Sequence, residues 1–244
     1  MNNKLYVSFA LFITFSSCVT ITKTIDDFDK LVHDNPQYYA VYYNRGMYYS
    51  EHQEYQKAIS DFSQTIKLNP SFLNVYNSRA IAYAEIKKFK EALTDINIAI
   101  SRNPNNALWY KNRCGIYLMM KDYENALVDI TKAISLNKKD IQIYEERAGI
   151  YSGLGEFQKA IDDCMHLIKI DPKKRGLYYS WTAFYYIQLG NNNKALEAYD
   201  QAIRFGSNTA QDYKNRGILY TMEKEYQKAL ADFNKAIGIS NNYK

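Results

Sequence analysis

A period of 34 residues constrains the fold of this chain more than any other feature of its sequence. Pro36, Pro70, Pro104 and Pro172 lie on one 34-residue grid. When each proline is numbered as position 32, six units begin at Tyr39, Leu73, Ala107, Ile141, Gly176 and Ala210. The step into the fifth unit is 35 residues, because one residue is inserted in the turn at 173–175. Periods of 20–50 residues are typical of arrays of stacked units.

Several positions carry the same residue in every unit. Position 4 is always tyrosine: Tyr42, Tyr76, Tyr110, Tyr144, Tyr179 and Tyr213. Position 11 is also always tyrosine: Tyr49, Tyr83, Tyr117, Tyr151, Tyr186 and Tyr220. Position 20 is always alanine, position 28 is always isoleucine, and position 8 is always small. Because these positions recur at helical spacing, each unit is predicted to form two amphipathic helices joined by a short turn.

The pattern of an aromatic, a small residue, tyrosine, alanine, a large residue and proline resembles the tetratricopeptide repeat (TPR) family. The resemblance covers residues 39–243, in six units over 39–72, 73–106, 107–140, 141–175, 176–209 and 210–243. A unit of 34 residues is too small to fold alone and must bury its faces against neighbouring units. The resemblance implies an all-α fold, a right-handed superhelical α-solenoid whose concave groove is lined by the first helix of each unit.

The two ends of such an array need separate treatment, because terminal units lack a neighbour. Residues 25–34 match the second helix of a unit, with Phe28 and Leu31 at its packing positions, and are predicted to form an N-terminal capping helix. The sixth unit leaves a helix face with Ala231, Lys235 and Ile239 open to solvent or to a partner. We expect self-association or docking at that face.

Two further positions vary together between units. Position 7 is arginine in five units: Arg45, Arg79, Arg113, Arg147 and Arg216. Position 23 is aspartate in the same five: Asp61, Asp95, Asp129, Asp163 and Asp232. The fifth unit has Thr182 and Ala198 instead, and this joint loss predicts that the two residues pair across the helices of one unit. The alternative is a ladder of arginines that binds an anionic ligand, but an arginine beside its own aspartate has little left to offer.

The first residues of the chain have the dimensions of an export signal. Residues 1–17 carry Lys4 and an apolar run from Leu5 to Phe15, too short to span a bilayer. Cys18 follows small residues and resembles the lipidated cysteine of a bacterial lipobox. This predicts a signal peptide over 1–17, a tether and capping helix over 18–38, and a lipoprotein anchored to the membrane of the cell envelope. Plain secretion, or a cytoplasmic protein without export, are the alternatives.

The sequence offers little chemistry for catalysis or cofactor binding. His33, His52 and His166 lie on different units, and no metal-binding or phosphate-binding motif is present. Cys114 and Cys164 fall at packing positions, which favours buried small residues over a catalytic thiol. A net charge of +5 is too small to indicate nucleic-acid binding. We therefore expect a non-enzyme without cofactor, metal or nucleic acid.

By resemblance, positions 2, 5, 9 and 12 of the first helices face the groove. The residues expected there are Tyr43, Met47, Asn77, Ile81, Leu108, Lys111, Leu118, Glu145, Leu177, Phe184 and Ile218. The lysine, asparagine and arginine set with which some family members grip a peptide carboxylate is absent. A mixed apolar and polar surface of this kind suits an amphipathic helix or a peptide with apolar anchors. The predicted function is a non-catalytic scaffold for protein partners, with a cytosolic chaperone-like adaptor as the alternative; a related RNA-binding repeat is disfavoured because the groove is not basic.

Overall fold

The computed structural model describes residues 24–207 and 209–241, and all regular structure in these residues is helical. The predictions for residues 1–17 and for Cys18 lie outside the described residues. The helices are α1 (Ile25–Asp34), α2 (Tyr39–Glu51), α3 (Tyr55–Leu68), α4 (Asn74–Glu85), α5 (Phe89–Arg102), α6 (Ala107–Met119), α7 (Tyr123–Leu136), α8 (Ile141–Gly153), α9 (Phe157–Ile170), the 3₁₀ turn η1 (Pro172–Lys174), α10 (Arg175–Gln188), α11 (Asn192–Arg204), α12 (Ala210–Met222) and α13 (Tyr226–Asn241).

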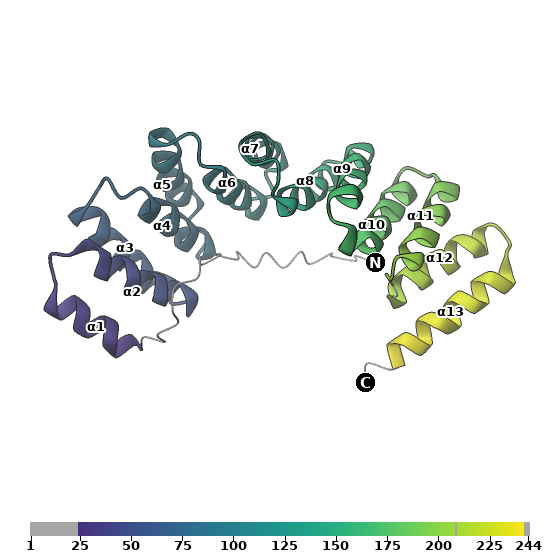
Figure 1. Ribbon diagram of the computed structural model, residues 1–244, viewed down its shortest axis with the longest axis horizontal. Coiled ribbons are helices and arrows are strands. Elements are labelled where there is room, and N and C mark those ends of the chain that lie inside the picture. Colours follow the sequence, from purple (N-terminus) through teal and green to yellow (C-terminus); the bar gives the residue numbers. More distant parts are fainter. Residues whose placement is uncertain (1–23, 208, 242–244) are drawn as a thin grey trace.

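The helices form an arch of stacked hairpins, from α1 at one end to α13 at the other (Figure 1). Each hairpin corresponds to one 34-residue unit of the sequence. Helices α4, α6, α8 and α10 lie on the inner side of the arch, and α5, α7, α9 and α11 lie on the outer side. Each helix packs against its neighbours along the chain, and α4 also packs against α2 and α6. The predicted all-α solenoid is confirmed.

The turn inside every hairpin contains one residue in the left-handed region of backbone conformation. The residue is at position 15 of each unit: Gln53, Lys87, Lys121, Gly155, Gly190 and Lys224. Their φ angles lie between 61° and 75°. Residues other than glycine, asparagine and aspartate rarely adopt this conformation. The four turns with glutamine or lysine at this position therefore carry local strain, which the packing of the two helices must overcome.

Close approach of the two helices explains the small residue at position 8. A Cβ atom added to Gly46 would lie 2.7 Å from the ring of Phe62 on the partner helix, and one added to Gly217 would lie 2.8 Å from Phe233. The alanines at position 20 are buried in all six units: Ala58, Ala92, Ala126, Ala160, Ala195 and Ala229. Small residues on both sides of the contact therefore set the distance between the helices of each hairpin.

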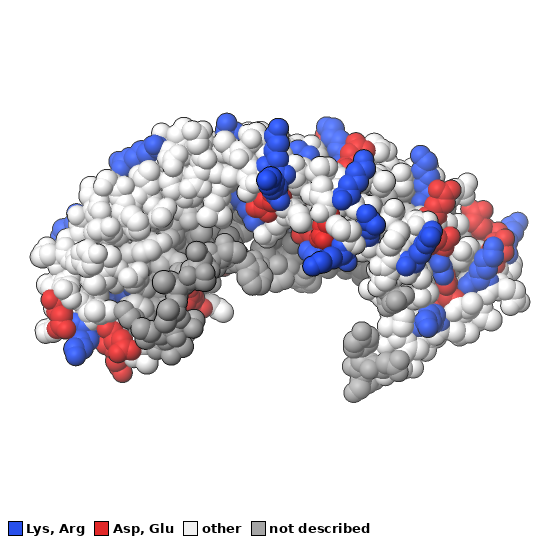
Figure 2. All heavy atoms as spheres, viewed as in Figure 1, with Lys and Arg blue, Asp and Glu red and all other residues white. Residues whose placement is uncertain are grey.

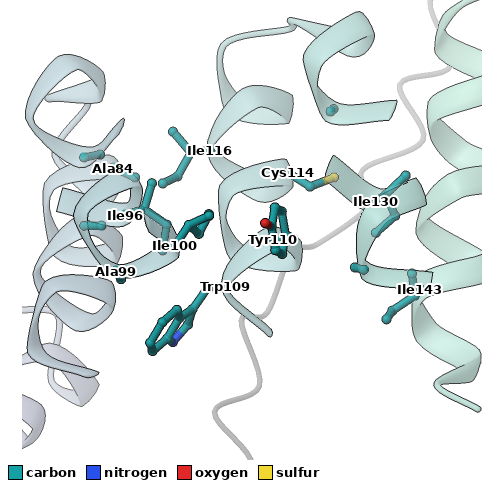
Figure 3. Packing of buried hydrophobic residues seen from close by; sticks show 14 of the residues in the cluster. Ala84, Ile96, Ala99, Ile100, Trp109, Tyr110, Cys114, Ile116, Ile130 and Ile143 are labelled. Carbon is teal, nitrogen blue, oxygen red and sulfur yellow. The ribbon is translucent and has the colours of Figure 1, made fainter. Parts of the chain in front are cut away.

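The core continues from one unit to the next without interruption at the middle of the arch. On α6, Ile116 and Trp109 face Ile96 and Ile100 of the preceding helix, while Cys114 points toward Ile130 of α7 (Figure 3). Trp109 and Ile116 are buried, with 3% and 2% of their surface exposed. Because each inner helix is buried on two sides, a unit depends on both neighbours for its stability.

The two ends of the arch differ in how they are covered. The predicted helix at 25–34 is confirmed as α1, which begins with a capping box formed by Thr24 and Asp27. Its Phe28 ring lies 5.4 Å from the ring of Tyr48 on α2. At the other end, the apolar stripe on α13 consists of Tyr226, Leu230 and Ile237, which are 62%, 56% and 59% exposed. Ala231 and Lys235 on the same helix are exposed, and Ile239 is half-buried.

Candidate protein-binding groove

A ladder of polar contacts joins the inner helices along the concave side. At the first three junctions between units, the residue at position 5 of one unit meets the residue at position 6 of the next, 35 residues later. Tyr43 Oη lies 3.3 Å from Ser78 Oγ. The Asn112 amide donates to the Asn77 Oδ1 at 2.8 Å. In the third and fourth units the contact is an ion pair, Lys111 to Glu146 at 3.7 Å. The ladder fixes the angle between successive inner helices.

The centre of the inner surface is strongly polar. The Lys111 ammonium also donates to the Gln142 side chain at 2.7 Å. Glu145 accepts hydrogen bonds from Tyr178 Oη at 2.7 Å and from Lys174 at 3.1 Å. Burial raises the pKa of Glu146 to about 7, because removal of the carboxylate from water outweighs the attraction of the Lys111 ammonium. The charges at this point are therefore mostly held by contacts within the chain.

The predicted groove residues differ in how much surface they expose. Met47 is buried, with 8% of its surface exposed, and packs in the core, so it offers a ligand little contact. Leu108, Leu177 and Ile218 are 54%, 41% and 45% exposed on α6, α10 and α12. The half-buried remainder are Tyr43, Asn77, Ile81, Lys111, Leu118, Glu145 and Phe184. Apolar surface open to a partner is thus concentrated in the third, fifth and sixth units.

Two glycines leave open space on the same helices. A Cβ atom added to Gly115 or to Gly149 would meet no other atom within 4 Å. Both occupy position 9, in adjacent units on α6 and α8. A glycine within a helix costs about 1 kcal/mol relative to alanine, and packing within the chain does not require either one. They leave a smooth strip of backbone to which a ligand could approach closely.

The structure brings all five predicted arginine–aspartate pairs together. In each unit Nε and Nη2 of the arginine donate to the two carboxylate oxygens of its aspartate, at distances from 2.6 to 2.8 Å. The aspartate side chains are 2–7% exposed and those of the arginines 17–19%. The guanidinium groups lie over the unit's tyrosines; that of Arg147 is 5.6 Å from the ring centroids of both Tyr144 and Tyr151. These arginines face the joint between helices rather than an anionic ligand.

Four of the five arginines also have a second partner that sequence reasoning missed. The Nη1 atom of four arginines donates to position 25 of the preceding unit, 16 residues earlier in the chain: Asp29, Ser63, Asn97 and Asp200. All four residues are polar and can accept a hydrogen bond, which is the sequence feature that could have indicated the contact. It was missed because the residue type at this position varies from unit to unit. One side chain therefore ties three helices together and couples successive units.

The structure gives no support for a reactive thiol or a metal centre in the residues it describes. Cys114 and Cys164 are fully buried, and burial raises the pKa of the Cys164 thiol to about 12 and that of Cys114 further. Across residues 24–207 and 209–241, no three His, Cys, Asp or Glu side chains are grouped as metal ligands would be. None of the helices in that part of the chain has the length and hydropathy needed to cross a membrane.

Solved structures with a similar fold are repeat proteins. The C-terminal part of a TPR repeat-containing protein from Cytophaga hutchinsonii aligns with a TM-score of 0.79 and 16% identity, covering 88% of both chains. A tetratricopeptide repeat protein from Parabacteroides merdae gives a TM-score of 0.61 and 22% identity, covering 88% of this chain and 85% of the other. YrrB, described as a TPR protein with an unusual peptide-binding site, gives a TM-score of 0.62 and 19% identity, covering 83% of this chain and 100% of the other.

Family models agree with these structures. No curated protein matches the sequence. Three family models described as tetratricopeptide repeat match residues 39–72, 141–174 and 183–244, which together make up more than half of the chain. The first match covers the first unit, the second lies in the fourth unit, and the third includes most of the fifth unit and the whole of the sixth; the described residues of these segments fold as helical hairpins. The chain belongs to the tetratricopeptide repeat family.

Proposed function

We propose that this protein is a non-catalytic scaffold that binds an amphipathic helix or an apolar-anchored peptide on the concave side of the arch. The observation that carries the proposal is the exposure of Leu108, Leu177 and Ile218 on inner helices, beside polar groups already engaged within the chain. Apolar anchors surrounded by satisfied polar groups are typical of protein-binding surfaces.

The surface charge also favours a protein partner. On the face that Figure 2 shows, basic and acidic side chains are interspersed over the right half of the arch and at its lower left end, while most of the left half carries few charges. Nucleic-acid binding would need a continuous basic stripe to contact the phosphates. YrrB, which shares this fold, is described as having a peptide-binding site.

Site-specific crosslinking tests the proposed groove. The photoreactive residue p-benzoylphenylalanine is placed at Leu108 on the inner side and, as a control, at Val128, which is 67% exposed on the outer helix α7. We expect a discrete crosslinked protein from position 108 and none from position 128, and we expect Leu177→Glu to abolish it. Equal crosslinking from both positions, or crosslinking at 128 alone, would contradict the proposal.

We also propose that lipid at Cys18 tethers the scaffold to the cell envelope. The support is the apolar run at 5–15 followed by small residues and a cysteine. Incorporation of radiolabelled palmitate and recovery in the membrane fraction are expected for the wild type and not for Cys18→Ala. A soluble, unlabelled protein that keeps Met1 would favour the cytosolic adaptor instead.

We also propose that the protein self-associates through the exposed face of α13. In the first five units the residue at position 21 is buried or half-buried, as with Ile59 and Leu93. The residue at position 21 of the sixth unit, Leu230, is 56% exposed. Light scattering at high concentration is expected to show a dimer for the wild type and a monomer for Leu230→Glu. A wild type that stays monomeric at high concentration would exclude this interface.

A further inference from the structure

The fifth unit differs from the other five on the outer side of the arch. Where they have the paired arginine and aspartate, it has Thr182 and Ala198. Position 25 of the preceding unit, which supplies a polar acceptor to four of the arginines, is Met165 at this junction. Three polar groups of one joint are thus replaced together by less polar ones.

A hollow of about 450 Å³ lies at this joint. Thr182 and Ala198 contribute to its lining and are 2% and 6% exposed, while Met165 is 40% exposed on α9. Tyr179 and Tyr186, the position 4 and position 11 tyrosines, also line it. In the other units the guanidinium occupies the space beside the corresponding tyrosine rings.

The tyrosine rings at the hollow are held in place without the arginine. The Tyr179 ring stacks on Phe205, with centroids 5.7 Å apart and planes 9° apart. The Lys194 ammonium lies 5.5 Å from the centroid of Tyr186. Lys159 lies at the same distance from its tyrosine in a unit that keeps the arginine, so this lysine does not substitute for the guanidinium. The space is therefore preformed rather than collapsed.

The chemistry of the inner lining favours an uncharged occupant. In the other units the guanidinium is matched by a carboxylate that is 2–7% exposed, and Ala198 removes that carboxylate here. The Thr182 hydroxyl already donates to the Tyr178 carbonyl oxygen at 2.9 Å. A cation here would lack the position 23 carboxylate of the other units. Of the two acidic residues that line the hollow, Asp200 is already paired with Arg216, so Glu197 alone remains to offset the cost of burying the charge. An apolar side chain would instead displace water from Met165, which is 40% exposed, and from the half-buried rings of Tyr179 and Tyr186.

The charged residues at the hollow are balanced in sign. Lys194 and Glu197 border it from α11, and neither has an ion-pair partner within 4.0 Å in the described part of the chain. Asp200 also borders it but is paired with Arg216 at 2.7 Å. An apolar centre with polar groups of both signs around it matches the anatomy of an anchor pocket in a protein interface.

We infer that the hollow at the fifth unit is a second binding site, on the outer side of the arch, which takes one aromatic or branched aliphatic side chain of a partner protein. This site is separate from the concave groove and does not depend on the function proposed for it. A partner could thus be held on both sides of the fifth unit, whose inner helix α10 also exposes Leu177.

Methyl-detected NMR on the full chain tests the site directly with three probes. These are the N-acetyl methylamides of phenylalanine, leucine and arginine, followed through the methyl groups of Met165, Thr182 and Ala198. We expect saturable shifts at these methyls with the phenylalanine or leucine probe, and at least tenfold weaker binding of the arginine probe. No saturable shift with either apolar probe, or tighter binding of arginine, would overturn the inference.

A matched pair of variants separates binding from general effects. Thr182→Arg combined with Ala198→Asp rebuilds the ion pair of the other units, and we expect it to fold and to lose the shifts. Arg113→Thr combined with Asp129→Ala and Asn97→Met copies the hollow into the third unit, and we expect a second set of shifts there. Shifts that persist in the rebuilt variant would contradict the assignment. If the third-unit variant does not fold, the rebuilt variant alone decides.

Discussion

Arg113 and Asp129 are joined by two parallel hydrogen bonds, from Nε to Oδ2 at 2.7 Å and from Nη2 to Oδ1 at 2.6 Å. Nη1 of the same guanidinium donates to Asn97 Oδ1 on the preceding unit at 2.5 Å. Hydrogen bonding to Asp129 raises the pKa of Arg113 above its usual range. One side chain therefore connects α5, α6 and α7 and fixes the rotation between two units.

The equivalent pair in the second unit is predicted to be strongly coupled. In a double-mutant cycle on Arg79→Ala and Asp95→Ala, we expect a coupling energy of about 1–3 kcal/mol, because Asp95 is buried and each residue loses its main partner when the other is removed. Urea unfolding of the four proteins measures it. The mismatched pair Arg79 and Asp163 serves as a control and should be additive within about 0.5 kcal/mol. Equal values for the two cycles would refute the pairing.

Most of the fold could be predicted from the sequence because each unit repeats the same packing problem. Tyrosine, alanine and isoleucine recur at fixed positions, so six copies confirm each other and even α1 could be assigned by its register. The joint loss of two partners in the fifth unit indicated the arginine–aspartate contact in the others. Comparison within one chain thus replaced comparison between chains.

The contacts between units were harder to predict. The ladder of positions 5 and 6 uses tyrosine with serine, asparagine with asparagine, and lysine with glutamate, so no recurring residue type marks it. The second arginine partner varies in the same way. Met47 was placed in the groove by its register, but the close packing of α2 on its neighbours buries it. Contacts that occupy equivalent places in successive units but use different residue types are therefore difficult to predict from the sequence.

The glycines of the inner helices are predicted to fall into two groups. Gly46→Ala and Gly217→Ala are expected to lower the free energy of unfolding by about 1–3 kcal/mol, because the added methyl group would lie under 3.0 Å from a phenylalanine ring. Gly115→Ala and Gly149→Ala are expected to raise it by about 1 kcal/mol each, since their helices gain propensity without a clash. Denaturant unfolding distinguishes the groups. A uniform loss of stability across all four would show that the inner helices do not have the predicted space.

The strained turns are predicted to respond in opposite directions to glycine and alanine. Lys121 has φ of 62°, which costs an L-residue about 1 kcal/mol or more. Lys121→Gly is therefore expected to raise the free energy of unfolding by about 1 kcal/mol, and Gly155→Ala, with φ of 75°, to lower it by a similar amount. Lys139→Gly, in a turn between units where no positive φ is found, is the control and is expected to gain nothing. Stabilisation by the control as well would show that the gain does not come from relief of the left-handed backbone conformation, because glycine acts on the unfolded state in the opposite direction.

Glu146, whose side chain is 10% exposed, is predicted to make stability depend on pH near neutrality. Burial raises its pKa to about 7 from an ordinary value of 4.5, so between these values the folded chain binds more protons than the unfolded chain. The contribution of this carboxyl group to the free energy of unfolding is therefore fully present below pH 4.5 and is lost as the pH rises through 7. Glu146→Gln removes this loss. At pH 8 we expect the variant to have a higher free energy of unfolding in urea than the wild type, by on the order of 2 kcal/mol. This difference is expected to shrink toward pH 4.5.

The Lys111 ammonium offers a second test of this carboxyl group. Lys111 lies 3.7 Å from Glu146 and favours the charged form, so Lys111→Met is expected to move the titration of Glu146 to still higher pH. Carbon-13 NMR of the Glu146 side-chain carboxyl follows the titration in both proteins. A midpoint near the ordinary value in the wild type, or an unchanged midpoint in Lys111→Met, would mean that the inner surface at the fourth unit is open to water. The charged pair would then be available to a ligand rather than held within the fold.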